Sequence, residues 1–171
     1  MRWWWAAAGS GGMGKSRRHF YVPRMMSRWR QRGRFLARRE GRRGVEVDLA
    51  DASSGTAPLL QAAFQNFPEV VDVLLEHRAD ANKEKYNGFT PLMVAAQQGS
   101  VQVAKLLLAK GADKAAKAGQ APLFLASRNG HKDVVVTLLA AGADKRAEWQ
   151  GWTAQSVARH LGHREVIALL A

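Results

Sequence analysis

The sequence predicts an all-α fold in which pairs of short helices stack on copies of one another. The pattern is clearest in residues 88–113, where Thr90 and then Ser100 are suited to cap two successive runs with apolar residues at helical spacing. Gly99 and Gly111 end these runs. One such pair cannot bury its apolar face alone, so the pattern requires neighbouring copies.

The copies are present at regular intervals. They begin at Gly55, Gly88, Gly119 and Gly151, with steps of 33, 31 and 32 residues. Each glycine opens a related phrase: GTAPLL, GFTPLM, GQAPLF and GWTAQS. The predicted repeats cover residues 55–87, 88–118, 119–150 and 151–171.

These phrases resemble those of the ankyrin-repeat family, whose unit of roughly 33 residues carries a Thr-Pro-Leu-His phrase and joins a β-turn to two helices. Gly-Ala-Asp at 111–113 and 142–144, and Gly-His at 130–131 and 162–163, match two further family phrases. The resemblance covers residues 45–171. It implies an ankyrin-repeat solenoid of helix-turn-helix units with β-hairpin loops.

Two departures from the family pattern have structural consequences. The family's histidine after Pro-Leu is replaced by Leu60, Met93 and Phe124, so we expect apolar contacts in place of its hydrogen bonds. Arg78 stands where two other repeats have glycine at the end of the second helix. A left-handed cap on a residue with a Cβ costs on the order of 1 kcal/mol.

The terminal repeats are less regular than the middle ones. In the first repeat, Pro68 and Glu69 suit the first turn of the second helix. In the fourth repeat, Ala154 and Gln155 replace Pro-Leu and the first helix is more polar, which is typical of a C-terminal cap. The alternative is a chain that stops before further repeats.

The basic residues are concentrated at the N-terminus. Residues 1–44 hold 13 of the 26 Lys and Arg residues and a single acidic residue, Glu40, while the rest of the chain is neutral. This composition predicts a basic, disordered arm. The arm could lack a dedicated role, act as an organelle transit segment, bind an anionic partner or direct nuclear import.

Two motifs within the arm do not support their usual functions. Residues 9–16 satisfy the phosphate-loop pattern GxxxxGK[ST], but a poor strand precedes them and Pro23 cuts short any following helix, so an accidental match in a Gly/Ser linker is favoured. Residues 16–20 resemble the start of a twin-arginine signal, but no apolar segment follows. We therefore predict neither nucleotide binding nor export through these motifs.

The sequence does not indicate catalysis or a metal site. Asp72, Glu76 and Asp80 are spaced like a solvated acidic stripe on a helix, and His160 and His163 have no third ligand type nearby. There is no cysteine. We therefore predict a non-enzymatic protein without a cofactor or metal.

The resemblance implies that a partner docks on a concave surface formed by the hairpin tips and the exposed side of each first helix. Aromatic residues among these positions are candidate anchors, since large exposed aromatics often anchor interfaces. For Trp149 and Trp152, the alternative is that they only cover the last hairpin. The predicted protein-binding residues are Phe64, Tyr86, Asn87, Phe89, Gln97, Gln98, Lys117, Gln120, Arg128, Asn129, Trp149 and Trp152, with Ser53, Ser54, Thr56, Gln65, Gln150 and His160 as further members of the same surface.

The predicted function is therefore a protein–protein interaction module with a protein partner. The alternative is that the basic arm binds nucleic acid or an anionic membrane and the repeats only support it. No apolar run approaches the ~20 residues of a spanning helix, and nothing indicates oligomerisation. The expected compartment is the cytoplasm or nucleus, with organelle import through the arm as an alternative.

Overall fold

The computed structural model describes residues 48, 55–115 and 121–171. These belong to one compact unit, Glu46–Ala171, which is described here by itself. Several predictions lie outside the described residues: the basic arm 1–44 with its motifs and alternatives, and the candidate binding residues Ser53, Ser54, Lys117 and Gln120.

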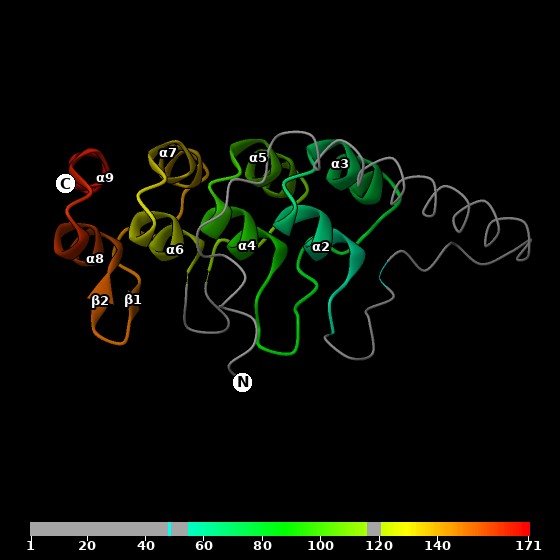
Figure 1. Ribbon diagram of the computed structural model, residues 1–171, viewed down its shortest axis with the longest axis horizontal. Helices are drawn as coiled ribbons and strands as arrows, with labels where there is room; N and C mark the ends of the chain where they lie inside the picture. The colour runs from blue at the N-terminus through cyan, green and yellow to red at the C-terminus, as the bar shows by residue number, and fades with distance from the viewer. Residues whose placement is uncertain (1–47, 49–54, 116–120) are drawn as a thin grey trace, which may run out of the picture. The chain divides into compact units, whose positions relative to one another are not determined.

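The described residues form helices arranged in successive pairs, with one short hairpin before the last pair (Figure 1). The prediction of an all-α stack of helix pairs is confirmed. The helices are α2 (Pro58–Phe64), α3 (Pro68–Glu76), α4 (Pro91–Gln98), α5 (Val101–Ala109), α6 (Pro122–Arg128), α7 (Lys132–Ala140), α8 (Ala154–Leu161) and α9 (Arg164–Leu170), and the strands are β1 (Glu148–Trp149) and β2 (Trp152–Thr153).

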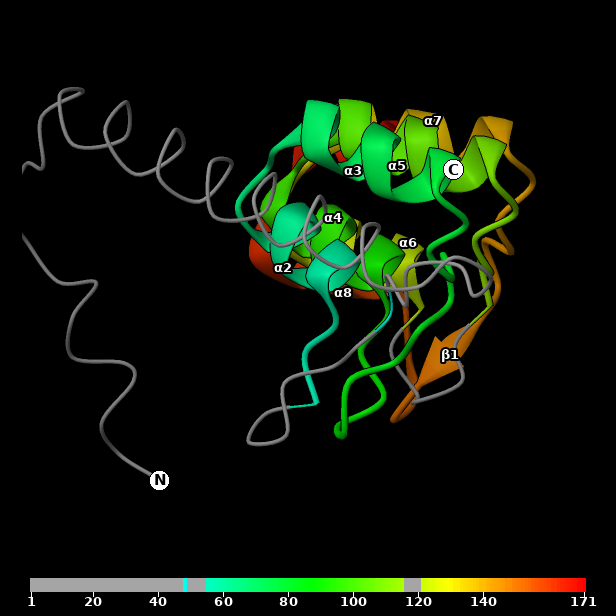
Figure 2. The same cartoon turned by 90° about the vertical axis from the view of Figure 1, so that its right-hand side faces the viewer.

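The helix pairs build two layers. The first helices α2, α4, α6 and α8 contact one another in chain order, and so do the second helices α3, α5, α7 and α9. Figures 1 and 2 show the loops at 79–89 and 143–153 extending from the first-helix layer, on the side away from the second helices. In the last of these loops, β1 and β2 are antiparallel, with Glu148 paired to Thr153 and Trp149 to Trp152.

The first helices begin in two different ways. Prolines start α2, α4 and α6, and the Thr90 hydroxyl accepts a hydrogen bond from the Met93 amide at 3.3 Å at the start of α4. Helix α8 has no proline. Instead, Thr153 and Ser156 form a capping box, in which the Ser156 amide donates to Oγ1 of Thr153 and the Thr153 amide donates to Oγ of Ser156.

The predicted capping by Ser100 is wrong in its side-chain detail. Ser100 does occupy the N-cap position of α5, but its side chain makes no capping hydrogen bond. Its Oγ is buried and has no hydrogen-bond partner among the described residues. The side chain of Ser100 is therefore buried but does not act as the predicted cap.

The predicted left-handed helix ends are confirmed. Gly99 (φ 74°) follows α4, and Gly111 (φ 82°) and Gly142 (φ 81°) stand one residue beyond the C-caps of α5 and α7. Arg78 occupies the equivalent position after α3 with φ 65°. A residue with a Cβ is therefore held in the conformation that glycine adopts in the next two repeats.

The core lies between the two layers and between successive repeats. Equivalent leucines, Leu59, Leu92 and Leu123, are fully buried at the second position of the first helices. Met93 and Phe124, two of the residues that replace the family histidine, are also buried, as is Leu60. The expectation that apolar contacts replace hydrogen bonds at these positions agrees with this burial.

Candidate protein-binding face

Each first helix ends with an exposed side chain at the same place in its repeat. Phe64, Gln97, Arg128 and His160 each stand seven residues after the N-cap of their helix, and all four are exposed. Because α2, α4, α6 and α8 pack in order, these side chains form a row across the first-helix layer. We call these four residues the inner row.

A second exposed row runs beside the first. Its members, Gln65, Gln98, Asn129 and Leu161, each follow an inner-row residue directly. Both rows consist of side chains left outside the core by the helical period, since the preceding residues of the helices are largely buried. The two rows and the exposed residues of the neighbouring loops are here called the inner face.

Hydrogen bonds from the following repeat hold the backbone of the inner row. The carbonyl of Gln97 accepts from Nε2 of His131 (3.1 Å) and from Nδ2 of Asn129 (2.9 Å), and the carbonyl of Arg128 accepts from Nε2 of His163 (3.0 Å). Nε2 must carry the proton in both histidines, because a carbonyl can only accept. Asn129, a predicted binding residue, thus also links two repeats.

The same two histidine rings lie against glycines of the preceding repeat. A Cβ placed on Gly99 would stand 2.7 Å from the His131 ring, and one placed on Gly130 would stand 2.7 Å from the His163 ring. Both glycines have positive φ. Glycine is therefore required at these positions by backbone conformation and by the close approach of a ring.

The loop between the first and second repeats presents one strongly exposed aromatic side chain. Tyr86 is 76% exposed, yet its ring lies close to Gly55 at the start of the same repeat, where an added Cβ would be 2.8 Å away. The Oδ1 atom of Asn87 accepts from the Phe89 amide at 3.3 Å, and Phe89 is only partly exposed. The loop thus offers Tyr86 to solvent, while Asn87 helps to shape the turn.

The two tryptophans of the last hairpin differ in their surroundings. The Trp149 ring meets the Phe124 ring edge-on, at 5.3 Å and 61°, and packs on a cluster formed with Ala121 and Val157. The Trp152 ring is 39% exposed and meets the ring of His160 at 5.2 Å and 62°. Trp149 therefore covers the core, whereas Trp152 connects the hairpin to the inner row.

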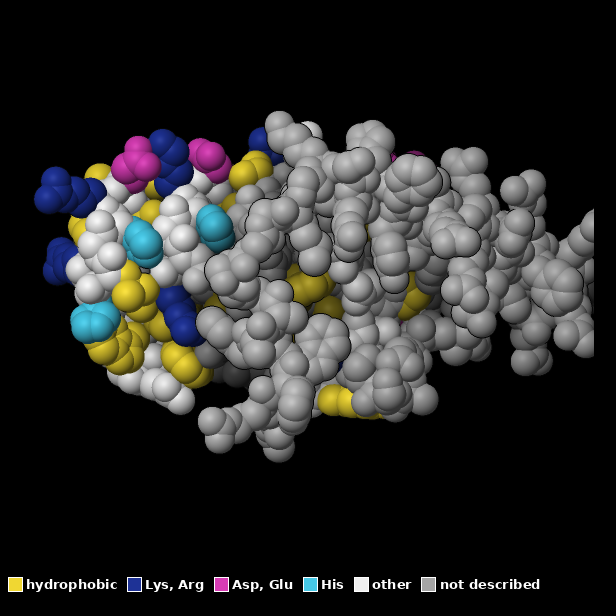
Figure 3. Space-filling model, in the orientation of Figure 1, with side chains coloured by type: hydrophobic (Ala, Val, Ile, Leu, Met, Phe, Trp, Pro, Cys, Tyr) yellow, Lys and Arg dark blue, Asp and Glu magenta, His cyan; other side chains and the backbone are white. Residues whose placement is uncertain are grey.

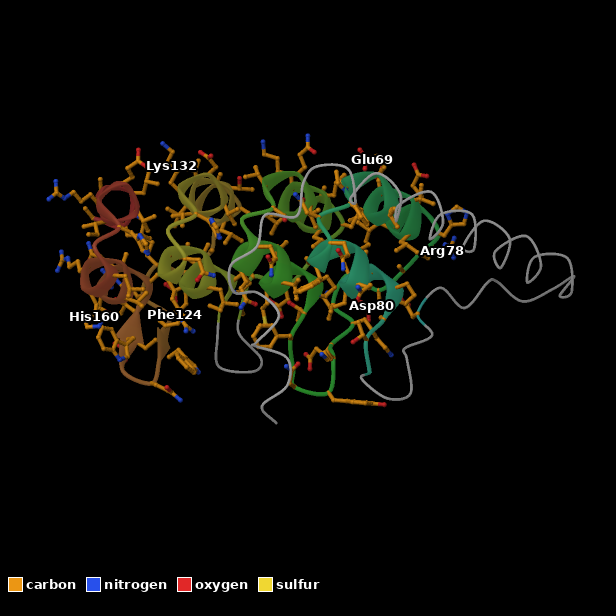
Figure 4. The ribbon with its side chains drawn as sticks, in the orientation of Figure 1. Glu69, Arg78, Asp80, Phe124, Lys132 and His160 are labelled. Atoms are coloured by element: carbon orange, nitrogen blue, oxygen red, sulfur yellow. The ribbon has the colours of Figure 1, made fainter. Side chains whose placement is uncertain are left out.

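Figure 4 shows the region around this cluster, with His160 at α8 and Phe124 at α6. Of the predicted binding residues that the structure describes, most are exposed on the inner face, and Thr56, Phe89 and Trp149 are partly buried. The sequence analysis missed Leu161, which is 48% exposed. Leu161 directly follows His160, as Gln98 follows Gln97 and Asn129 follows Arg128. The alignment of the repeats could therefore have predicted it.

The ion pair between Lys132 and Glu165, which shifts the pKa of Lys132, lies in the layer of second helices. Nζ of Lys132 on α7 donates to Oε1 of Glu165 on α9 at 2.8 Å, and this hydrogen bond, with the charge of Glu165, raises the pKa of Lys132. Both side chains are largely exposed. The pair links the second helices of the last two repeats, and Figure 4 shows Lys132 at α7, in the second-helix layer.

Neither a metal-binding cluster nor a membrane-spanning helix occurs in the part of the chain that the structure describes. In residues 48, 55–115 and 121–171, no three His, Asp or Glu side chains are placed to hold a metal ion. Over the same ranges, no helix has the length and apolar character needed to cross a membrane.

Relatives of known name match a part of the chain. The B-cell lymphoma 3 protein homolog of Mus musculus is 35% identical over 75 residues, which are 44% of this chain and 17% of that protein. The nuclear factor NF-kappa-B p105 subunit of Gallus gallus is 41% identical over 71 residues, 41% of this chain and 7% of that protein. The palmitoyltransferase AKR1 of Lachancea kluyveri is 39% identical over 69 residues, 40% of this chain and 9% of that protein. The chain thus spans less than a fifth of the length of each.

Family models match most of the repeat region. A model of ankyrin repeats in three copies matches residues 34–118, and a single-repeat model matches residues 118–148. The first match begins upstream of residue 45, where the sequence resemblance was placed. The helix pair α8–α9 lies beyond both matches and continues the same arrangement. On the repeat phrases, the two-layer stack and these matches, the chain belongs to the ankyrin-repeat family.

Proposed function

We propose that this chain is a non-enzymatic interaction module that binds a protein partner through its inner face. Repeats of this family act as protein-interaction units, and stacked repeats present extended binding surfaces. The observation that carries the proposal is the inner row, where each repeat places an exposed side chain at the same position beside the exposed loop aromatics Tyr86 and Trp152.

The aromatic members of this face are the expected anchors. Phe64 is 49% exposed and Trp152 is 39% exposed, so part of each ring is available to a partner. Aromatic side chains are enriched among the few residues that dominate interface energies. Trp149 is expected to contribute less, because its ring already packs on Phe124.

Affinity capture with the full chain as bait tests this proposal. Phe64→Ala and Trp152→Ala should each weaken the captured complex by on the order of 1–3 kcal/mol. The control is Val136→Ala on α7, a residue of similar exposure (47%) in the other layer, which should leave affinity unchanged. Circular dichroism and thermal unfolding check that each variant is folded. Unchanged affinity of both aromatic variants for every captured partner would contradict the proposal.

A second candidate function rests on the basic arm. Residues 1–44 carry half of the Lys and Arg residues with one acidic residue, which suits binding to nucleic acid or an anionic membrane. Binding of this kind should weaken steeply as salt rises and should vanish when residues 1–44 are removed. Binding through the inner face should survive both changes.

The composition of the chain also leads to an expectation about its cellular compartment. The absence of cysteine suits a reducing compartment, so we favour the cytoplasm or nucleus, with organelle import through the arm as the alternative. Imaging of a C-terminal fluorescent fusion, with and without residues 1–44, distinguishes these locations.

A further inference from the structure

Charge is distributed unevenly along the repeat region. Residues 46–87 contain eight acidic and three basic residues, whereas residues 88–171 contain five acidic and ten basic residues. The second to fourth repeats therefore carry a net positive charge, and within them the third and fourth repeats, residues 119–171, hold six basic and four acidic residues. A surface in these repeats should favour a negatively charged partner.

The two rows of the inner face carry a single fully charged side chain, which is basic, whereas the exposed loop residues include acidic side chains. The two rows contain no acidic residue among the described repeats, and Arg128 is the fully charged member. Phe64 and Gln97, at the other end of the inner row, are uncharged. Glu148 on β1 is an exposed acidic residue of the neighbouring hairpin. The acidic side chains that Figure 3 shows in the C-terminal repeats lie mainly over the second-helix layer.

The backbone of Arg128 is held by a hydrogen bond, while the charge of its guanidinium has no acidic partner among the described residues. Its carbonyl is held by Nε2 of His163 at 3.0 Å, so its backbone is fixed to the next repeat. Among the described residues, no carboxylate forms an ion pair with its guanidinium. A planar guanidinium can bind a carboxylate through two parallel hydrogen bonds, so Arg128 is suited to an acidic side chain of a partner.

An apolar surface lies beside this cation. Leu161 and Trp152 are both exposed, and the Trp152 ring contacts His160, the neighbour of Arg128 in the inner row. Neighbouring helices in such packing are about 8–10 Å apart. A single extended segment of a partner can therefore reach the charged and the apolar residues together.

We propose that the third and fourth repeats bind an acidic peptide segment of the partner, which pairs a carboxylate with Arg128 and packs an apolar side chain on Trp152 and Leu161. This inference rests on the proposed function and adds the chemical class of the partner.

The test uses the full chain with one introduced cysteine, because the chain has none of its own. Gln98→Cys, labelled with an environment-sensitive fluorophore, reports binding at the inner face, and Val136→Cys reports on the other layer. The probes are a synthetic glutamate-rich peptide with two leucines and matched peptides with glutamine or lysine in place of glutamate. An acidic peptide bound only to the basic arm should leave the label on the inner face unchanged.

We expect the acidic peptide to change the fluorescence of the inner-face label and to bind about tenfold more tightly than the glutamine peptide. Arg128→Gln and Trp152→Ala should each weaken this binding by about tenfold. The matched control is Lys105→Gln, which removes an exposed cation from α5 in the other layer and should change nothing at the inner face.

The inference is overturned if the acidic peptide leaves the inner-face label unchanged, if the lysine peptide binds at least as tightly, or if Arg128→Gln has no effect in a folded protein. None of these outcomes alters the capture experiment with Phe64→Ala. A partner lost on that substitution would leave the proposed function standing while the acidic class of the partner fails.

Discussion

Arg78 illustrates how one residue departs from the repeat pattern and remains in the same backbone conformation. Its φ of 65° is close to the values of Gly111 (82°) and Gly142 (81°) at the equivalent positions. The left-handed region is unfavourable for a residue with a Cβ, whereas glycine adopts it readily. The first repeat therefore contains a local strain that the second and third repeats avoid.

Arg78→Gly should stabilise the protein by a few tenths to about 1 kcal/mol, because it relieves this strain. Urea unfolding monitored by circular dichroism measures the change. The reverse change, Gly111→Arg, is the control and should destabilise by a similar amount, since nothing lies within 4 Å of a Cβ placed there. A destabilising Arg78→Gly would show that the Arg78 side chain contributes more than the strain costs.

The glycines of the repeats have two different reasons to be glycine, and two substitutions separate them. Gly111→Ala should cost about 1 kcal/mol from backbone conformation alone. Gly99→Ala should cost about 1–3 kcal/mol more, because its Cβ would stand 2.7 Å from the His131 ring and displace the hydrogen bond of that ring to Gln97. Equal costs in thermal or urea unfolding would show that the histidine ring moves aside freely.

At the scale of whole elements, the junctions between repeats are not equivalent. His131 and His163 each place a ring against a glycine and donate to a carbonyl of the preceding repeat. At the junction between the first and second repeats, Ser100 stands at the histidine position and Asn66, with φ 53°, stands at the glycine position. At this junction the small Ser100 stands where the other junctions have histidine, and the larger Asn66 stands where they have glycine. The ring contact and the ring-to-carbonyl hydrogen bond of the other junctions cannot form here, because serine has no ring.

Ser100→His and Asn66→Gly should therefore be coupled. Ser100→His alone should be neutral or destabilising, because the Cβ of Asn66 occupies the place where the ring would lie. With Asn66→Gly present, the ring can pack and reach the Phe64 carbonyl, so a double-mutant cycle should show a favourable coupling of about 1 kcal/mol. Additive effects in unfolding experiments would mean that the two positions do not interact in this way.

At the scale of the whole repeat region, the differences between junctions predict an order of opening. Stacked repeats are stabilised by their nearest neighbours, so the repeat with the weakest junction should open most easily. Native-state hydrogen exchange should show lower opening free energies for amides of α2 and α3 than for those of α4 to α7. Helix α9, which contacts α7 and α8, should also open early. Uniform protection across the helices would contradict this order.

The N-terminal arm gives a prediction for the whole chain. Limited proteolysis should remove the basic residues of 1–44 and leave a resistant fragment that starts near residues 40–50, since the arm has few apolar residues at core spacing. The family match begins at residue 34. A resistant fragment starting near residue 34 would instead show that residues 34–44 pack on the repeats, and survival of the intact chain would contradict the prediction.

The sequence by itself determined the repeat architecture of this protein. Prolines at helix starts, glycines at helix ends and apolar spacing act within a few residues of one another, so the helix pairs and the left-handed position of Arg78 could be predicted. The burial of Met93 and Phe124 followed from their place in the repeat phrase. The inner row could be predicted in the same way, because it repeats with the unit.

Only the tertiary structure decided which of those residues are fixed by contacts and which remain exposed to solvent. Ser100 does not cap its helix, Trp149 packs on Phe124 while Trp152 remains partly exposed, and Asn129 bonds the Gln97 carbonyl. The Asn129 hydrogen bond joins residues 32 positions apart in two repeats, and the Trp149–Phe124 contact joins residues 25 positions apart. Local propensity cannot encode such contacts, because they depend on how the side chains of neighbouring repeats share the space between them.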